Sequence, residues 1–417
     1  MGQVNTPFLV GAGKVDITPP LNVGILMSSM ERAWAPFESV RTPLFARAVT
    51  IAHDDRRVAL ISLELLGLSE LSVGGYAGFK ERIAAATEHA ISADNIVLTS
   101  THTHSAPSSL GLTDLYRTPQ FRAWFDALVQ AIAAALRQAV AAETPCRLAT
   151  GQVEVDGLAT YRRIRTVDGV VLNNVPPPPE KVISSAGPVD KSVRVAALLD
   201  ARDRPVALLV NAACHPVYEM CIPRVSGDYP GEMSRSLESS HPGATALFLN
   251  GAAGNINPPS VSSGAGEAIR HGERLAAAVD GLLGNLRPVA GDALRLARRR
   301  LQLPARTVAG DPSPEPLPAE IAALRLGDAA FLFLPGEPFV ETGLALYEAS
   351  PFHDTFIVGY AEDWIGYIPT DQALDEGGYE TGPGAWSRVG YGGEGMVRQA
   401  GIDLLTLKDA RAALANT

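Results

Sequence analysis

The chain has 417 residues, of which 46% are hydrophobic and 19% charged, a composition typical of globular proteins that excludes a disordered or fibrous chain. The formal net charge of -10, without a Lys/Arg-rich block, argues against a nucleic-acid partner. No apolar run is long enough to span a membrane, and the first residues lack the pattern of a secretory signal. The three cysteines are too few for a disulfide framework, so we expect a cytoplasmic protein.

Strand-like and helix-like segments alternate along the chain. Apolar, β-branched and aromatic runs predict strands at 8–18, 45–52, 57–68, 95–104, 192–200, 205–216 and 244–258, and further strands within 322–339 and 354–369. Apolar residues at helical spacing predict helices at 75–90, 121–142, 231–240 and 267–286, and a closing helix within 392–414. The alternation predicts an α/β fold of layered mixed β-sheets flanked by helices, forming one domain over residues 1–417.

Two segments differ from this pattern. Residues 173–190 contain four consecutive prolines, which exclude a helix or a central strand and predict an extended surface excursion or lid. The basic cluster at 298–300 follows a strand-like segment, and we interpret it as a solvated strand end.

Polar side chains follow four of the apolar strands. They are His102 and His104, then His215, then the amides of a Gly-rich loop, and finally Glu337. Because ligands of α/β sheets bind beyond the carboxyl ends of the strands, four such endings predict a common site.

The pair His102 and His104 is separated by one residue. On a strand both side chains would point to the same face, about 6.6 Å apart along the chain, so both could line one cavity. That spacing predicts that they do not share a metal ion. The alternative is a pair of hydrogen-bonded histidines that caps the strand.

His215 and Glu337 extend the candidate site. His215 could instead be a buried histidine at a strand terminus, and Glu337 could be an acid at the start of a helix. Two histidines and one carboxylate from separate strands are typical of catalytic zinc sites, which keep one position for water and lower its pKa. The pattern therefore favours a metal hydrolase, although neither H-E-x-x-H nor C-x-x-C occurs.

The motifs STHTHSAP, SGDYPGE, NGAAGNINP, LPGE and IGYIPT occur in the order found in the neutral/alkaline (non-lysosomal) ceramidases, which the chain resembles over most of its length. That family consists of zinc-dependent amidases. The resemblance implies that Zn²⁺ is held by His102, His215, Glu337 and Tyr367. It also implies that His104 lies beside the metal and orients substrate or shuttles a proton, and that either Arg162 or Arg163 points into the site.

The sequence departs from that family in three places. Asn257 stands where the family has an essential serine, and Asn255 replaces an aspartate. An amide can donate to a developing oxyanion but cannot become an alkoxide, so a classical long-chain ceramide is not the expected substrate. We also expect the protein to lack the family's C-terminal immunoglobulin-like domain and a signal peptide.

Several of these residues have structural alternatives. Asn255 and Asn257 could simply form a turn, and Tyr367 and Trp364 could be core aromatics. Asp228 in SGDYP could support the site or cap the following helix.

Taken together, the sequence predicts a zinc-dependent hydrolase that cleaves an amide, or an ester or lactone, with a metal-activated water. Arg162 or Arg163 and Asn257 would place the substrate or its oxyanion. We expect a small-molecule substrate, for which the polar loops are at least as suitable as for a sphingolipid. A zinc-dependent lyase or isomerase on a small polar substrate and a metal-stabilised binding protein are alternatives, and a homo-oligomer is left open.

Overall fold

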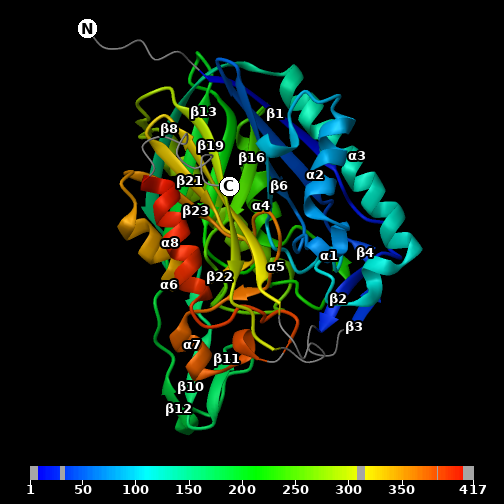
Figure 1. Ribbon diagram of the computed structural model, residues 1–417, viewed down its shortest axis with the longest axis vertical. Helices are drawn as coiled ribbons and strands as arrows, with labels where there is room; N and C mark the ends of the chain where they lie inside the picture. Colours follow the sequence, from blue (N-terminus) through cyan, green and yellow to red (C-terminus); the bar gives the residue numbers. More distant parts are fainter. Residues whose placement is uncertain (1–7, 29–32, 308–314, 383, 407–417) are drawn as a thin grey trace.

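The computed structural model describes residues 8–28, 33–307, 315–382 and 384–406 (Figure 1). Its largest sheet contains nine strands. In spatial order eight of them are β16 (Thr245–Asn250), β14 (Pro205–Ala212), β13 (Ser192–Leu199), β8 (Thr144–Glu154), β1 (Phe8–Asp16), β5 (Phe45–His53), β6 (Arg56–Leu63) and β7 (Ile96–Ser100). The short β18 (Arg287–Pro288) pairs with β8. The sheet is mixed, because β14 and β16 run parallel, as do β6 and β7.

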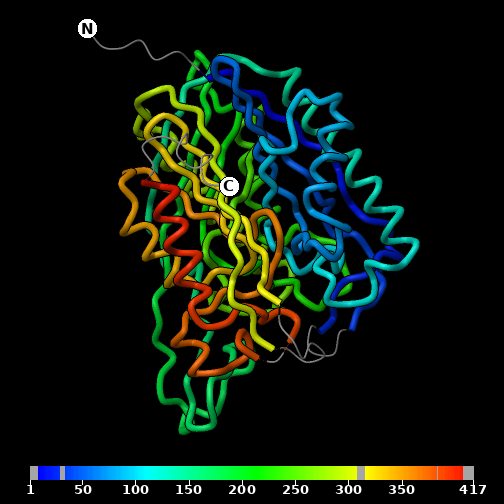
Figure 2. The backbone as a smooth tube through the Cα atoms, in the orientation of Figure 1, coloured from blue at the N-terminus to red at the C-terminus, as the bar shows by residue number. Residues whose placement is uncertain are grey.

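A second sheet lies against the first. Its strands are β19 (Leu294–Leu303), β20 (Leu317–Leu326), β21 (Ala329–Phe333) and β23 (Asp354–Val358), and the last two are parallel. The space between the sheets is filled by an apolar core to which both contribute. In Figure 2 the first third of the chain lies on the right and the last third lies on the left.

Helices cover the outer faces of both sheets. On the large sheet, α2 (Tyr76–Ala86) and α3 (Pro119–Ala141) pack on the half that contains β5 and β6, and α4 (Asp228–Ser240) and α5 (Ala265–Leu283) pack on the half that contains β13 and β14. On the second sheet lie α6 (Val340–Ala349) and α8 (Gly393–Thr406). The predicted class, layered mixed sheets flanked by helices, is confirmed.

The shorter elements lie mainly around the site and in the loops. They are β2 (Gly24–Ser28), β3 (Ala33–Pro36), β4 (Ser39–Val40), β15 (Arg224–Val225), β17 (Ile256–Asn257), β22 (Glu337–Pro338), β24 (Tyr367–Ile368), α1 (Glu70–Val73), α7 (Asp371–Glu376), and the 3-10 turns η1 (Ala93–Asn95), η2 (Asp114–Arg117), η3 (Pro179–Lys181) and η4 (Tyr379–Thr381).

Most predicted elements are present, and the differences lie at their ends. The strand predicted at 95–104 ends at Ser100, and the strand predicted at 205–216 ends at Ala212. The part of the predicted closing helix beyond residue 406 lies outside the described residues. The cluster at 298–300 is solvated at Arg299 and Arg300, as expected, but it lies inside β19 and not at a strand end. Arg298 is largely buried and pairs with Glu320 and Glu362, each at 2.7 Å.

The large sheet bends strongly, and this bend positions the site. Strand β16, at one end of the strand order, lies against β5, β6 and β7 at the other end. Ser62 Oγ donates to the Phe248 carbonyl at 2.7 Å, and Asn250 Nδ2 donates to the Thr101 carbonyl at 3.2 Å. The loops that follow β7, β14 and β16 therefore meet, although the sheet order separates β7 from β14 and β16.

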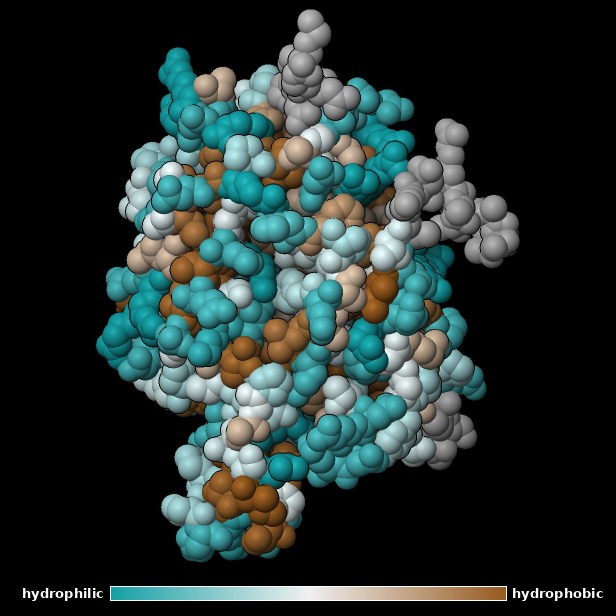
Figure 3. All heavy atoms as spheres, turned by 90° about the vertical axis from the view of Figure 1, so that its left-hand side faces the viewer, coloured by the Kyte–Doolittle hydropathy of each residue, from teal (hydrophilic) through white to brown (hydrophobic). Residues whose placement is uncertain are grey.

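The Pro-rich segment belongs to an arm, defined here as residues 160–190, that stands off the lower end of the molecule (Figure 1). Its strands are β9 (Thr160–Tyr161), β10 (Arg163–Thr166), β11 (Gly169–Leu172) and β12 (Val182–Ser184). The prolines connect β11 to β12, which is an edge strand paired only with β10 among the described residues. Hydrophobic side chains, including Val167 and Ile183, are exposed on this arm (Figure 3).

No helix in the described ranges has the length and apolar character needed to cross a membrane.

Candidate functional site

The two neighbouring histidines lie in the loop beyond β7, not on the strand. His102 has a φ of 69°, a left-handed conformation that turns the chain immediately after the strand. His102 Nε2 and His104 Nε2 are consequently 3.3 Å apart. The expectation that strand geometry keeps these histidines too far apart to share a metal is therefore wrong.

Backbone carbonyls fix the orientation of two histidine rings. His102 Nδ1 donates to the Leu66 carbonyl at 2.6 Å, and the ring stacks on Tyr360 with centroids 4.2 Å apart. His215 Nδ1 donates to the Ala253 carbonyl at 2.8 Å. With the proton on Nδ1, each Nε2 atom presents its lone pair to the cavity, as is usual for histidines that bind a metal.

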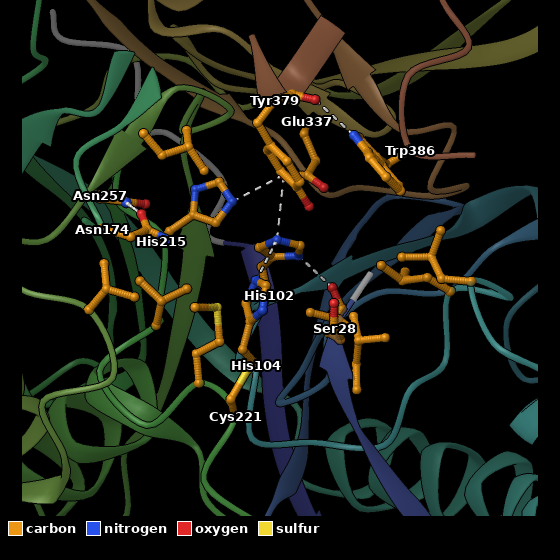
Figure 4. Close-up of a pocket in the computed structure, with 18 of the residues that line it drawn as sticks. Ser28, His102, His104, Asn174, His215, Cys221, Asn257, Glu337, Tyr379 and Trp386 are labelled. Carbon is orange, nitrogen blue, oxygen red and sulfur yellow. Dashed lines mark hydrogen bonds and ion pairs between the residues drawn. The ribbon is translucent and has the colours of Figure 1, made fainter. Parts of the chain in front are cut away.

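Glu337 completes the cluster (Figure 4). Its Oε2 atom lies 3.1 Å from His215 Nε2 and 3.5 Å from His102 Nε2. Its Oε1 atom accepts a hydrogen bond from Trp364 Nε1 at 2.9 Å. Trp364, which the sequence left open as a core aromatic, thus fixes the carboxylate while its ring contributes to the wall of the cavity.

Strand pairing brings Tyr367 beside Glu337. The two residues are direct partners in the parallel pair of β22 and β24. The Tyr367 side chain is buried and lines the same cavity, and burial raises the pKa of its phenol well above the usual value of 10.

Burial keeps the histidines neutral. Desolvation lowers the pKa of His102, His104 and His215 well below the ordinary value of 6.5. Neutral imidazole is the form that binds metal ions, so these side chains are ready for coordination near pH 7.

The spacing of the donor atoms fits a zinc ion. A tetrahedral zinc with bonds of about 2.1 Å holds its ligand atoms about 3.4 Å apart. Glu337 Oε2 lies 3.1 Å from His215 Nε2 and 3.5 Å from His102 Nε2, and His102 Nε2 lies 3.3 Å from His104 Nε2. The three histidines also form a group whose ligand atoms all lie within 4.8 Å of one another. His102, His215 and Glu337 could therefore hold the metal with Tyr367, or His104 could join the set.

The structure distinguishes the two consecutive arginines. Arg162 lines the cavity, and its Nη1 atom lies 3.3 Å from both His215 Nε2 and Asn257 Oδ1. Arg163 points away from the cavity, towards the Gly377 carbonyl, to which Nη2 donates at 2.8 Å. Both guanidinium groups meet the buried carboxylate of Glu380, which no local sequence pattern marks as functional.

Asn257 lies at the cavity but is oriented differently from the expectation. Its Nδ2 atom donates to Asn173 Oδ1 at 2.9 Å and to Asn174 Oδ1 at 3.2 Å, both on the arm. Its Oδ1 atom faces Arg162. Both N–H groups of the Asn257 amide are thus directed to asparagine oxygens of the arm. The prediction that Asn257 donates to an oxyanion does not agree with this arrangement.

Asn255, in contrast, stabilises the local structure at the start of α6. Its Oδ1 atom accepts from the Val340 backbone N–H at 2.9 Å, and its Nδ2 atom donates to Glu341 Oε2 at 2.7 Å. It therefore satisfies a donor at the start of α6 and does not line the cavity.

Asp228 belongs to the start of α4. Its carboxylate accepts from the backbone N–H groups of Glu219 at 2.9 Å and Tyr229 at 2.6 Å, and it does not line the cavity. Burial raises the pKa of this carboxyl group to about 7. The helix-start alternative agrees with these contacts.

We expect the Asp228→Asn substitution to change the pH dependence of stability. In the unfolded chain an aspartate has a pKa of about 3.9, so between pH about 4 and 7 the folded wild type binds a proton that the unfolded chain does not. The stabilisation is present below this window and is lost as the pH rises through it. The free energy of unfolding of the variant, measured in urea at several pH values, should therefore rise relative to wild type from acidic to neutral pH. Parallel curves would contradict the expectation.

The cavity has a volume of about 260 Å³ and a largely apolar wall. Apolar lining residues include Leu26, Leu66, Leu110, Leu172, Val217 and Trp386. The expectation of polar surroundings is therefore wrong for most of the wall. The polar groups include the histidine cluster with Glu337, Arg162, the asparagines of Figure 4, Ser28 and the phenols of Tyr367 and Tyr379.

Comparison with known proteins assigns the chain to a family. Residues 8–259 match the family described as neutral/alkaline non-lysosomal ceramidase, N-terminal. The chain belongs to this ceramidase family. The matched residues 8–259 include His102, His104, Arg162, His215 and Asn257. Glu337 and Tyr367 lie outside the matched residues.

Solved ceramidase structures share the fold over nearly the whole chain. The neutral ceramidase from Pseudomonas aeruginosa superposes with a TM-score of 0.77 at 20% identity, covering 96% of this chain and 74% of that one. A ceramidase complexed with C2 gives a TM-score of 0.78 at 18% identity, covering 96% and 75%. No curated protein matches the chain by sequence.

Proposed function

We propose that the protein is a zinc-dependent hydrolase that cleaves an amide bond of an acylated small molecule. The observation that carries the proposal is the convergence of neutral imidazoles and the Glu337 carboxylate at the spacing of a tetrahedral metal site. Membership of the ceramidase family supports the amide as the bond that is cleaved.

In the proposed ligand set, His102, His215, Glu337 and Tyr367 hold the metal. Bound zinc would polarise the substrate carbonyl and lower the pKa of a water molecule. The three-histidine set, in which His104 replaces Tyr367 or Glu337, is the alternative that the short distance between His102 and His104 favours.

The protein's own groups would supply positioning and proton transfer. His104 is neutral and presents Nε2 beside the cluster, so it can accept a proton from the attacking water and deliver one to the leaving amine. Arg162 would bind the acyl oxygen, and Asn257 would hold Arg162. The apolar wall would exclude bulk water and strengthen these interactions.

The cavity size restricts the substrate. A volume of about 260 Å³ lies just below the roughly 300–1,000 Å³ that is usual for ligand pockets. A short apolar acyl chain fits this space, whereas a long-chain ceramide would leave most of its chain outside. The resemblance puts Asn257 where the family has a serine, and this supports a changed substrate.

The proposal is tested by assaying the zinc-loaded protein against amide, ester and lactone libraries that include a long-chain ceramide. We expect hydrolysis of short-chain N-acyl amides, with ceramide cleaved poorly or not at all. An isomerised or eliminated product would support the zinc-dependent lyase or isomerase instead. A protein that binds zinc without turning over any carbonyl substrate would favour a binding function.

Replacing Trp364 by phenylalanine should weaken metal binding while keeping the aromatic wall. The substitution removes the hydrogen bond from Nε1 to Glu337 Oε1, which holds the carboxylate in place. Loss of such an outer partner typically lowers metal affinity about 10- to 100-fold. Competition with a chelating dye measures the change, and Trp386→Phe is the matched control because Trp386 lines the cavity but donates to the Tyr379 carbonyl. Equal affinities of the two variants would contradict a role of Trp364 in holding Glu337.

A further inference from the structure

Glu380 joins two consecutive arginines that point in different directions. Its Oε1 atom accepts from Arg162 Nε at 2.8 Å, and its Oε2 atom accepts from Arg163 Nη1 at 2.7 Å. All three side chains are almost completely inaccessible to solvent, and Glu380 is 0% exposed. A buried carboxylate needs such partners, because an unpaired charge in this environment costs several kcal/mol.

The two arginines extend from Glu380 in different directions. Arg163 is anchored away from the cavity, since Nη2 also donates to the Gly377 carbonyl at 2.8 Å and the guanidinium stacks over Phe339. Arg162 extends into the cavity, where its guanidinium lies over the ring of Tyr367 with 5.3 Å between Cζ and the centroid. Glu380 is thus fixed on one side by Arg163 and fixes Arg162 on the other.

Arg162 keeps one donor without a protein acceptor. Its Nε atom is used by Glu380 and Nη1 by Asn257 Oδ1, while His215 Nε2, also 3.3 Å from Nη1, belongs to the proposed ligand set. Its Nη2 atom is buried and makes no hydrogen bond of normal geometry with any described residue, and the interacting oxygen beyond the partners above is the Tyr367 hydroxyl. An unsatisfied buried N–H group of a charged side chain is costly, and an acceptor that enters the cavity would relieve this cost.

We propose that Glu380 is a positioning residue that directs Arg162 Nη2 towards the acyl oxygen of the ligand. The proposal rests on the hydrolase function for the identity of the substrate, but the geometry applies to any acyl or carboxylate oxygen. The planar guanidinium makes the arrangement directional, because anchoring Nε and Nη1 fixes where Nη2 points. Glu380 does not touch the ligand and acts through Arg162.

Hexanoate is a suitable probe, because it resembles the acyl product and is short enough for the cavity. Its binding to the zinc-loaded full-length protein can be followed by tryptophan fluorescence, since Trp364 and Trp386 line the cavity. We expect Glu380→Gln to weaken hexanoate binding about tenfold, in keeping with the loss of a positioned charge-assisted hydrogen bond.

Glu376→Gln is the matched control, and it should change the affinity less than twofold. Glu376 pairs with Arg163 at 3.5 Å and is partly exposed, and it forms no ion pair with Arg162. If Glu380→Gln binds hexanoate as tightly as Glu376→Gln, the proposal is wrong. If Glu380→Gln does not fold, Glu380→Asp takes its place. Aspartate keeps the negative charge, but its shorter side chain moves the carboxylate oxygens away from Arg162, so the hexanoate affinity should fall to a similar extent.

A double-mutant cycle separates positioning from general support of the structure. In an Arg162→Met background, Glu380→Gln should cause no further loss of hexanoate affinity, whereas in an Arg163→Met background the loss should persist. A full additional loss on top of Arg162→Met would overturn the proposal. Zinc content, measured in the same samples by elemental analysis, reports separately on the metal site, so failure of the hydrolase proposal and failure of this one are distinguishable.

Discussion

Replacing His102 or His215 by alanine is expected to remove zinc from the protein and to abolish turnover. Each substitution deletes an Nε2 donor that lies 3.1 to 3.5 Å from Glu337 Oε2. Even the loss of an outer partner lowers metal affinity about 10- to 100-fold, so loss of a ligand should lower it by more. Elemental analysis after dialysis measures the effect, and His241→Ala is the control because His241 pairs with Asp280 near the surface.

His104→Ala distinguishes the two ligand sets. If His102, His215, Glu337 and Tyr367 hold the metal, the variant should retain zinc and lose most of its turnover. If His104 is itself a ligand, zinc and turnover should be lost together. Full zinc in both His102→Ala and His215→Ala would show that the metal is not bound at this cluster.

Replacing Arg47 by methionine is expected to destabilise the fold by about 3–5 kcal/mol, because removal of one partner leaves buried charges unpaired. Arg47 is 2% exposed and donates to Glu64 at 2.5 Å and to Glu238 on α4 at 2.7 Å. It therefore connects β5 to a helix on the other half of the bent sheet. Methionine fills much of the volume of the arginine side chain. The loss of stability should therefore reflect the missing positive charge and not a cavity.

Urea denaturation measures the expected loss. Arg57→Met is the control, because Arg57 pairs with Glu143 on the partly exposed side of the sheet and such a bridge contributes about 0–1 kcal/mol. The double variant Arg47→Met/Glu64→Gln should recover part of the loss, since it also removes one buried charge. Equal stabilities of Arg47→Met and Arg57→Met would contradict a stabilising role of the buried network.

The sheets and helices were predictable from the sequence, but the geometry of the histidine pair was not. Apolar runs and helical spacing determine where most elements lie, and these are local properties. The strand ends at Ser100, four residues before the predicted end, and the position of His104 then depends on the positive φ of His102. Hydrophobic periodicity carries no information on such a turn, so extrapolating the strand gave the wrong separation.

Other features of the site depend on partners that are distant in the sequence. Alternation along the chain indicates that only one of Arg162 and Arg163 faces the cavity, but which one depends on distant partners, Asn257 for Arg162 and the Gly377 carbonyl for Arg163. The orientation of Asn257 similarly depends on Asn173 and Asn174 of the arm. Because no short motif marks these partners, the sequence alone predicted the residue types of the site better than their hydrogen bonds.

The bent sheet has a consequence for how the metal centre would assemble. The proposed ligands span residues 102 to 367, and they meet only when strands from both ends of the sheet order lie together. During synthesis from the N-terminus, a nascent chain would hold His102 and His215 long before Glu337 and Tyr367 emerge. Full coordination would thus be a late event, and a metal ion bound there would cross-link most of the polypeptide and favour the completed fold over partly folded chains.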